Sequence, residues 1–476
     1  MRIHDPNKRM ASRFVLFLPL ALVISTACTC STLSDLAMLQ TAHTRTPPAG
    51  EAAPSETSAI TSHPPDQTTL SDETAEPAPL AWKNNWLHFG VDSQFSSYKP
   101  DETQITKQNI AELEFIWGSG CDDGYFSVFG GTPALFHGRI IITHAGGWLE
   151  SGSPYTGEMF WDFGEPAAAW APPPVVSSDG VIYYLYVTPD ASSKLYAVDA
   201  QTGQQIWEAA TQFHTGFNFD AQLTVDEKNG LLYIIEDLFG DGRLFAIDRD
   251  TGEVQWLLGG ERVQAQEMTF AGSIVPLKDD KLYVPADVPA EHSKQSRMVR
   301  VDALKQEVDL TYDIPEAAGL GWKVGWYGLC ADYVFETYQD SARNATLLAA
   351  HHLDQPEVIW QKNIPPQSGR LACDPQQGLV YIPTDKGLLA LHASTGEKVW
   401  EHAGISSIFS PTIANGILYY LSDTNMYALD QENGSQLFRY PLGVGAHPST
   451  GVAVNDGLVV FSGNGGTCDL VVLGLQ

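Results

Sequence analysis

Beyond residue 81, short runs of alternating apolar and polar positions recur along the chain, and turn signals separate them. Asp179-Gly, Asn229-Gly, Asn415-Gly and Asn455-Asp-Gly each precede β-branched or aromatic residues. Glycine readily adopts the positive φ that a tight hairpin requires, and apolar alternation indicates half-buried strands. The pattern therefore predicts many short antiparallel strands.

A second pattern, Ala-x-Asp-x-x-Thr-Gly-x-x-x-Trp, follows most of these hairpins. It is clearest at 197–207, 246–256 and 390–400, weaker at 428–438, and shortened or degraded at 155–161, 301–310 and 352–360. One unit is therefore four strands in about 40–50 residues, the repeat length of a β-propeller blade. The closing aromatic residue or its replacement falls at 161, 207, 256, 310, 360, 400 and 438, which makes seven units.

An eighth unit starts at Gly445 and stops at Gln476, after only three strands. The segment 113–117, Leu-Glu-Phe-Ile-Trp, ends in the expected tryptophan and can supply the fourth strand. We therefore expect an all-β, eight-bladed propeller of four-stranded antiparallel blades over residues 81–476. An N-terminal strand that completes the last blade would close the ring and remove its free edges.

The docking motif and the opening segment Trp86-Leu-His-Phe-Gly-Val-Asp resemble the quinoprotein-type eight-bladed propellers, as do Ile105, Asn109, Ile110, Leu113 and Trp117. That family includes pyrroloquinoline quinone (PQQ) alcohol dehydrogenases and BamB-like lipoproteins, which act in outer-membrane barrel assembly. The resemblance covers residues 86–476. It is specific for the fold, because the motif recurs with fixed spacing. It is weak evidence for function, because function belongs to sites that differ between proteins of one fold.

The dehydrogenases of this family carry an adjacent Cys-Cys pair, calcium-ligating Glu, Asn and Asp, and an Asp base. This sequence has no adjacent cysteines, and no residue aligns with the ligands or the base. The resemblance therefore assigns no catalytic residue, cofactor or metal site, and it favours a non-catalytic binding or scaffold protein. A PQQ- and calcium-dependent alcohol or sugar dehydrogenase and a small-molecule-binding sensor are the alternatives.

The N-terminus reads as an export signal. Four basic residues lie within residues 1–13, an apolar run covers 14–24, and Ser25-Thr-Ala-Cys28 follows. This order is typical of a secretory signal. It also resembles a bacterial lipoprotein signal, which would lipidate Cys28 (Cys30 is a weaker alternative), although Ser25-x-Ala27 equally suits ordinary cleavage. We expect a signal at 1–30 and a Thr/Ser/Pro-rich tether without aromatic residues at 31–80.

Charge narrows the choice of partners. The chain carries 57 acidic and 27 basic residues, a formal net charge of −30. This balance argues against nucleic-acid binding through a basic surface. The export signal predicts lipid anchoring to the cell envelope, in the periplasm or on the outer surface. The resemblance to BamB-like lipoproteins implies a monomeric propeller that binds an envelope protein.

Four cysteines lie beyond the signal: Cys121, Cys330, Cys373 and Cys468. Leu470 aligns with Leu195 and Trp117 with Trp207, so Cys468 and Cys121 align with Ser193 and Thr211. If Asp199 pairs with Gln205, that register sets Ser193 opposite Thr211, and it predicts a Cys121–Cys468 bridge. Cys330 and Cys373 fall near the starts of inner strands in adjacent blades. They form either a disulfide or two buried thiols.

One mouth of the predicted channel is rich in aromatic residues. The loops that run from the outermost strand of one blade to the innermost strand of the next share a rim. Aromatic rings with a few polar groups at a concave mouth suit a peptide or a flat ligand, whereas rings wedged between blades would be core. The residues of this candidate binding rim are Tyr125, Phe129, Trp170, His214, Phe217, Phe219, Trp322, Trp326, Tyr327 and His447.

Overall fold

The computed structural model describes eighteen stretches of the chain, all within the unit Ala75–Gln476. They are residues 85–88, 90–119, 131–143, 147–164, 172–188, 193–211, 213, 223–236, 242–260, 268–272, 274–289, 294–315, 324–340, 345–404, 409–422, 424–443, 451–462 and 469–475. The predicted signal at 1–30, Cys28 and the predicted tether at 31–80 lie outside them. In the described stretches, no helix is long and apolar enough to span a bilayer.

The first four blades follow one another along the chain. Blade 1 contains β3 (Ala134–Phe136), β4 (Arg139–Thr143), β5 (Leu149–Gly152) and β6 (Met159–Phe163). Blade 2 contains β7 (Val175–Val176), β8 (Val181–Val187), β9 (Ser193–Asp199) and β10 (Gln205–Glu208). Blade 3 contains β11 (Thr224–Asp226), β12 (Leu231–Glu236), β13 (Arg243–Asp248) and β14 (Val254–Gly259). In blade 4, β15 (Thr269–Phe270) and β16 (Leu277–Lys278) both pair with β17 (Lys281–Pro289), followed by β18 (Lys294–Asp302) and β19 (Glu307–Thr311).

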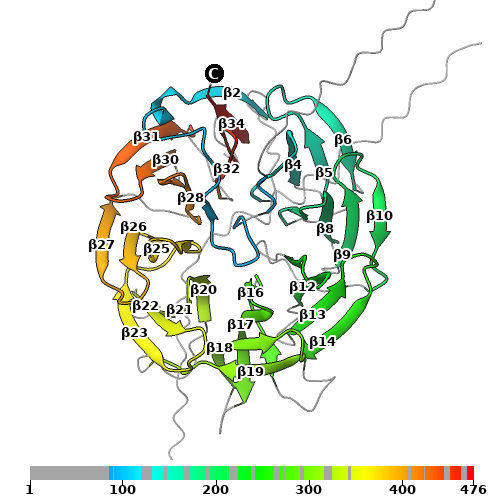
Figure 1. Cartoon of the computed structure of the whole chain (residues 1–476), viewed down its shortest axis with the longest axis vertical. Coiled ribbons are helices and arrows are strands. Elements are labelled where there is room, and N and C mark those ends of the chain that lie inside the picture. Colours follow the sequence, from blue (N-terminus) through cyan, green and yellow to red (C-terminus); the bar gives the residue numbers. More distant parts are fainter. Residues whose placement is uncertain are drawn as a thin grey trace, which may run out of the picture. The chain divides into compact units, whose positions relative to one another are not determined.

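The other four blades complete the ring (Figure 1). Blade 5 contains β20 (Val324–Cys330), β21 (Tyr333–Asp340), β22 (Ala345–His352) and β23 (Val358–Ile364). Blade 6 contains β24 (Ala372–Asp374), β25 (Leu379–Thr384), β26 (Gly387–His392) and β27 (Lys398–Ala403). Blade 7 contains β28 (Thr412–Ala414), β29 (Ile417–Leu421), β30 (Asn425–Asp430) and β31 (Gln436–Pro441), and β1 (Tyr98–Lys99) runs parallel to β28. Blade 8 combines β32 (Ala453–Asn455), β33 (Leu458–Ser462) and β34 (Leu470–Gly474) with β2 (Glu114–Ser119).

The eight four-stranded antiparallel blades confirm the predicted fold. Each predicted closing aromatic position, from 161 to 438, lies in the outer strand of its blade. In blade 8 that strand is β2, which lies outside β34 with Trp117 opposite Val472. A short 3-10 helix, η1 (Ile110–Glu112), precedes β2. Apolar clusters between neighbouring sheets form the core.

The motif works as a dock between neighbouring blades. Among the described residues, Trp117, Trp161, Trp207, Trp360 and Trp400 each donate an indole N–H at 2.6–3.2 Å to a carbonyl in the β-turn of the next blade. Each ring also covers the turn glycine, which takes a positive φ. In blade 2, the Asp199 carboxylate holds this turn by accepting from the Thr202 N–H and hydroxyl. The repeat therefore encodes contacts between blades as well as strands.

One detail of the predicted register is wrong. Gln205 pairs with Val198 rather than with Asp199, and a bulge separates Gln205 from Trp207. Beyond the bulge, Trp207 faces Ala197 and Glu208 faces Tyr196. The bulge restores the expected register for the rest of the hairpin, so the alignment of Trp117 with Trp207 and of Leu470 with Leu195 is confirmed.

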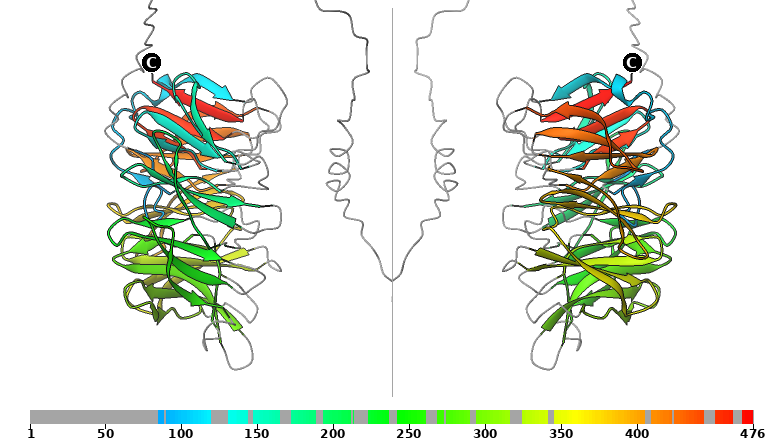
Figure 2. Two further views of the ribbon diagram at one scale, coloured as in Figure 1. Left: turned by 90° about the vertical axis from the view of Figure 1, so that its right-hand side faces the viewer. Right: turned by 90° about the vertical axis from the view of Figure 1, so that its left-hand side faces the viewer.

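An N-terminal segment, residues 86–105, crosses one face of the ring and is called the strap below (Figures 1 and 2). Its carbonyls accept N–H bonds, all at 2.8 Å, from the inner strands of five blades. The donors occupy equivalent positions: Leu135, Val176, Leu277, Cys373 and Ile413. Inner strands have a free edge toward the channel, so the strap satisfies backbone groups there and ties distant blades together.

Candidate functional site

The structure divides the candidate binding rim. Tyr125, Phe129, Trp170, His214, Phe217, Phe219, Trp322 and His447 lie outside the described residues. Tyr327 on β20 is only 4% exposed, and its hydroxyl donates to the Ile274 carbonyl at 2.7 Å. The prediction that Tyr327 belongs to a binding rim is therefore wrong. Its ring fills the space between blades 4 and 5, because alternate residues of a strand point to opposite faces.

Trp326, the neighbour of Tyr327, remains partly exposed on the innermost strand of blade 5. The guanidinium carbon of Arg370 lies 5.4 Å from the centre of its ring, a cation–π geometry. Arg370 is itself buried and comes from the segment just before β24. This pair places an aromatic face and a cation together between blades 5 and 6. The aromatic pattern predicted Trp326, whereas nothing in the sequence connected it with Arg370.

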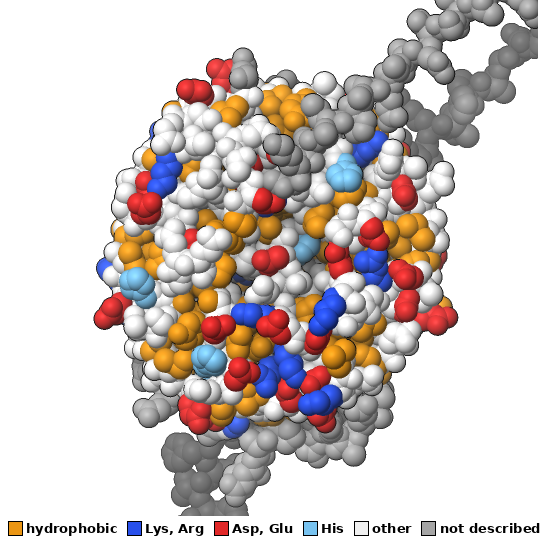
Figure 3. Space-filling model, in the orientation of Figure 1, with side chains coloured by type: hydrophobic (Ala, Val, Ile, Leu, Met, Phe, Trp, Pro, Cys, Tyr) orange, Lys and Arg blue, Asp and Glu red, His pale blue; other side chains and the backbone are white. Residues whose placement is uncertain are grey.

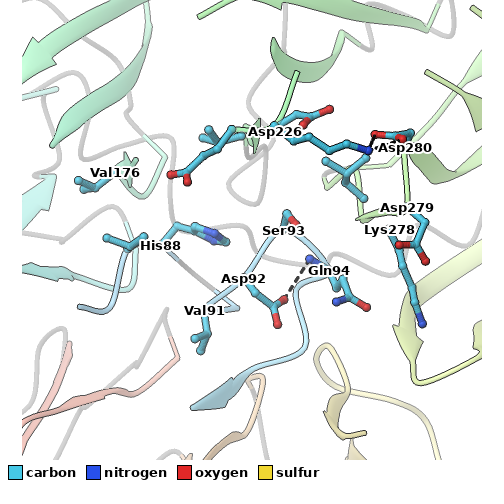
Figure 4. A pocket seen from close by; sticks show the side chains of 15 residues that line it. His88, Val91, Asp92, Ser93, Gln94, Val176, Asp226, Lys278, Asp279 and Asp280 are labelled. Atoms are coloured by element: carbon cyan, nitrogen blue, oxygen red, sulfur yellow. Dashed lines mark hydrogen bonds and ion pairs between the residues drawn. The ribbon is translucent and has the colours of Figure 1, made fainter. Parts of the chain in front are cut away.

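A pocket of about 550 Å3 opens on the strap side, between the strap and blades 2, 3 and 4 (Figure 4). It forms where the strap passes from blade 2, which it contacts through Leu87, to blade 4, which it contacts through Ser93. The lining residues are Leu87, His88, Val91, Asp92, Ser93, Gln94, Val176, Val225, Asp226, Glu227, Lys228, Leu277, Lys278, Asp279 and Asp280. Sequence reasoning missed this pocket, because it depends on how the strap lies across the ring.

Most carboxylates of the pocket already serve the protein's own structure. Asp226 accepts from the Asn229 backbone and amide and from the Tyr233 hydroxyl. Glu227 accepts from the Ser178 backbone N–H and hydroxyl in the preceding blade, blade 2. Asp280 binds the Lys228 ammonium at 2.6 and 2.8 Å. These contacts cap turns and join blades, and Figure 3 shows this face, where acidic and basic side chains lie together near the centre.

The strap wall of the pocket is a tight turn built on Asp92. Its carboxylate accepts from the Gln94 and Ser96 backbone N–H groups at 3.0 Å and from the Ser96 hydroxyl at 2.6 Å. Burial raises the pKa of Asp92, and these hydrogen bonds and the nearby His88 oppose the shift. Val91, beside Asp92, has φ 72°. That conformation is strained for a β-branched residue, and it persists because the surrounding bonds fix the turn.

A buried polar network within blade 5 was not predicted. His351 Nε2 lies 2.8 Å from Glu336 Oε1, and the Tyr338 hydroxyl donates to Glu336 Oε2 at 2.9 Å. All three side chains are at most 1% exposed. These bonds satisfy polar groups in the buried interior of blade 5.

The inner strands of blades 5 and 6 are joined covalently. Cys330 at the end of β20 and Cys373 in β24 form a disulfide, with 5.2 Å between their Cα atoms. This finding resolves the two alternatives for this pair in favour of the disulfide. Cys121 and Cys468 lie outside the described residues, so their predicted bridge stays a prediction.

A PQQ and calcium site like that of the dehydrogenases would need several oxygen ligands close together. No three His, Cys, Asp or Glu side chains among the described residues group closely enough to hold a metal ion. The disulfide joins residues 43 positions apart in buried strands, unlike a ring formed by adjacent cysteines. These residues supply no donor set to which calcium can be assigned, so no catalytic step is derived through PQQ.

The comparisons with known proteins find relatives named as enzymes and a structure of BamB. A tetrathionate hydrolase of Acidithiobacillus ferrooxidans is 22% identical over 276 residues, which is 55% of this chain. The chain spans about half of that protein, 51% of its length. A quinohemoprotein alcohol dehydrogenase of Pseudomonas putida HK5 shares the fold with a TM-score of 0.60 at 16% identity, over 82% of this chain and 80% of that one.

The structure of BamB from Moraxella catarrhalis superposes with a TM-score of 0.53 at 15% identity. The match covers 76% of this chain and all of that one. At these identities, likeness to solved structures shows the fold alone. The family described as outer membrane protein assembly factor BamB matches residues 145–307 and 344–474, more than half of the sequence. The chain therefore belongs to this BamB-type family of β-propellers.

Proposed function

We propose that this propeller is an exported binding protein of the cell envelope, which holds a protein partner and catalyses no reaction. The observation that carries the proposal is the family match over residues 145–307 and 344–474. The fold likeness to BamB over the whole of that chain supports it. Side-chain hydrogen bonds in the described ring hold turns, docks and contacts between blades.

Export is supported by chemistry within the described ring. The Cys330–Cys373 disulfide is buried, with both residues 1% exposed. Structural disulfides persist in oxidising compartments and are rare in the cytosol. The basic, then apolar, N-terminus supplies a matching export signal. We propose further that Cys28 carries the lipid and that residues 31–80 tether the propeller to a membrane surface.

Cell fractionation of a producing bacterium tests the anchor. The wild-type chain is expected in the membrane fraction, with a mature N-terminal peptide that begins at lipidated Cys28 by mass spectrometry. Cys28→Ser is expected to leave the chain soluble or unprocessed, and Cys30→Ser is the matched control. An unmodified Cys28 in the mature protein would contradict the anchor, while the binding function could still hold.

Partner binding is tested with a photo-reactive side chain placed in living cells. Met159 and Ile206 on outer strands are 56% and 52% exposed, so substitution there spares the core. Further sites are Phe115, Ile359 and Val399. The proposal expects cross-links to one envelope protein from a contiguous subset of these positions. Equal labelling of many proteins from every position would overturn it.

A PQQ-dependent oxidoreductase is the second candidate. The fold likeness to the alcohol dehydrogenase and the Trp326–Arg370 pair on the channel side favour it. The purified chain is titrated with PQQ and calcium while its melting temperature and the reduction of a dye with alcohols and sugars are followed. Saturable stabilisation with turnover would replace the binding proposal. Unchanged melting and no dye reduction are expected.

A further inference from the structure

The junction between blades 4 and 5 lacks the indole dock. In the repeat, the closing tryptophan faces a small residue across the strand pair, as in Ala197–Trp207 and Ala350–Trp360. At this junction the equivalent pair is Arg300 and Leu310. At this junction the large side chain therefore lies on the opposite strand of the pair, and it is a guanidinium instead of an indole.

Arg300 reaches the turn carbonyl that accepts from an indole N–H in the other docks. In each dock, the carbonyl that accepts the indole N–H belongs to the second residue of the turn, such as Ala393, which follows His392. The equivalent residue in blade 5 is Leu353, which follows His352. The Arg300 guanidinium donates to the Leu353 carbonyl at 2.9 Å, and the Tyr312 hydroxyl donates to the same oxygen at 2.8 Å. The guanidinium thus takes over the role of the indole N–H.

Carboxylates on both sides of the junction hold this guanidinium. Asp309 on the neighbouring strand of blade 4 accepts at 2.8 and 3.3 Å, and Asp354 in blade 5 accepts at 2.6 Å. Lys281 binds Asp309 at 2.8 Å and Asp302 at 2.5 Å. Figure 3 shows charged side chains gathered over this part of the face, around β17–β19. The Arg300–Asp354 pair, the Arg300–Leu353 bond and the Tyr312–Leu353 bond cross from blade 4 to blade 5 at the dock position. Elsewhere along the junction, Lys278 also crosses to the Ala331 carbonyl and Asp332 of blade 5.

This junction is weaker than the one on the other side of blade 5. An ion pair loses hydration when it forms, which offsets much of its attraction, whereas a packed indole gains from burial. On its other side, blade 5 is held to blade 6 by the Trp360 dock and by the Cys330–Cys373 disulfide. The family match also skips residues 308–343, which begin at this junction.

An apolar cluster lies beneath the ionic contacts. Blade 4, blade 5 and the strap all contribute to it. Its buried members include Phe95, Ile274, Tyr283, Met298, Tyr312 and Tyr327. Separation of the two blades would expose these rings to a partner or to solvent.

We propose that the blade 4–blade 5 junction is an ionic latch, the seam at which the ring opens when salt weakens the bonds of Arg300 to Asp354 and Leu353. This goes beyond the proposed binding function and does not depend on the identity of a partner. Raising NaCl from about 0.1 M to about 1 M shortens the Debye length from about 10 Å to about 3 Å. The Asp354 side chain is 75% exposed, so salt screens its attraction to Arg300 first.

Amide hydrogen exchange of the purified propeller tests the latch. The Asp313 N–H donates to the Pro356 carbonyl across the junction at 2.8 Å, so it reports on opening. Its exchange is expected to rise about fivefold over the salt range, the scale of a weakened surface ion pair. The Gly396 N–H, bonded to His392 within the Trp360 dock, is the internal reference and is expected to stay constant.

Two variants separate a latch from general salt sensitivity. Arg300→Ala with Leu310→Trp swaps the pair back to the repeat pattern and is expected to abolish the salt response of Asp313. Asp354→Asn keeps the side-chain volume at an exposed site and serves if the double variant does not fold. It is expected to speed exchange at low salt and to flatten the salt response. An equal salt response in both amides, or one unchanged in Asp354→Asn, would overturn the latch.

Discussion

The indole of Trp360 covers Gly396 so closely that a Cβ added at Gly396 would lie 2.7 Å from the ring. The same indole donates to the Ala393 carbonyl at 2.9 Å. Gly396 has φ 69°, so the dock needs glycine both for backbone conformation and for space. Each blade junction of this type is therefore specified by a glycine in one blade and a tryptophan in the preceding blade.

Gly396→Ala is expected to lower the free energy of unfolding by about 2–5 kcal/mol. About 1–2 kcal/mol comes from the left-handed conformation and about 1–3 kcal/mol from overpacking against Trp360. Gly378→Ala in the same blade is the matched control, because φ is 64° there and no atom lies within 4 Å of the added Cβ. Urea unfolding measures both variants, and equal losses would show that the indole contact contributes nothing.

Removal of the Cys330–Cys373 disulfide is expected to destabilise the ring. The bridge closes a loop with a separation of 43 residues. The chain-entropy treatment gives about 4 kcal/mol for a loop of this length, with about 2–4 kcal/mol typical. Cys330→Ala with Cys373→Ala avoids new polar groups at these buried sites and is compared with wild type in oxidised and reduced urea titrations. An unchanged unfolding midpoint would contradict the stapling role.

The Cys121–Cys468 bridge remains a prediction, and the register of the β2–β34 ladder supports it. The β2–β34 ladder pairs Trp117 with Val472 and Ser119 with Leu470, and the Asp469 N–H donates to the Ser119 carbonyl at 2.9 Å. If the register continues, Cys121 and Cys468 come opposite each other two residues later. Peptide mapping without reductant is expected to recover the linked peptides, and alkylation of both cysteines as free thiols would refute the bridge.

Stability is expected to fall in acid partly through Asp302. Its hydrogen bond with the Lys281 ammonium, joined by bonds from Lys305, holds the pKa of Asp302 well below its usual range. A lowered folded-state pKa stabilises the protein above the unfolded pKa of about 3.9, and that contribution is lost as the pH falls through the folded value. Urea unfolding of Asp302→Asn between about pH 5 and about pH 2 is expected to show a shallower decline than wild type. Parallel declines would show that other carboxyl groups are responsible.

The repeat made most of the fold predictable, because each blade carries its own turn glycines and its own dock. The alignment of Trp117 with Trp207 came from the same repeat and placed β2 outside β34. The bulge that pairs Gln205 with Val198 was not predictable, since a shift of one residue leaves the apolar pattern of the flanking strands unchanged.

The candidate site was less predictable. Trp326 and Tyr327 are adjacent aromatic residues, and the sequence does not distinguish between them. Strand alternation leaves Trp326 partly exposed and buries Tyr327 between blades. The pocket beside Asp92 depends on the path of the strap, which has no repeat to align with. In the sequence, Arg300 belongs to a degraded copy of the repeat. Only the structure shows that it lies opposite Leu310, at the position of the dock.

The pairing of β2 with β34 has a consequence for folding kinetics. Glu114 faces Gly474, so the last blade joins residues from opposite ends of the described chain. Contacts between residues so far apart in sequence slow folding, because the entropy of closing the loop is lost before the contacts form and stabilise the chain. During synthesis, the strap and β2 emerge first and have to wait for their partners. The ring therefore closes only after β34 has been made, and a chain shortened before residue 470 leaves β2 unpaired.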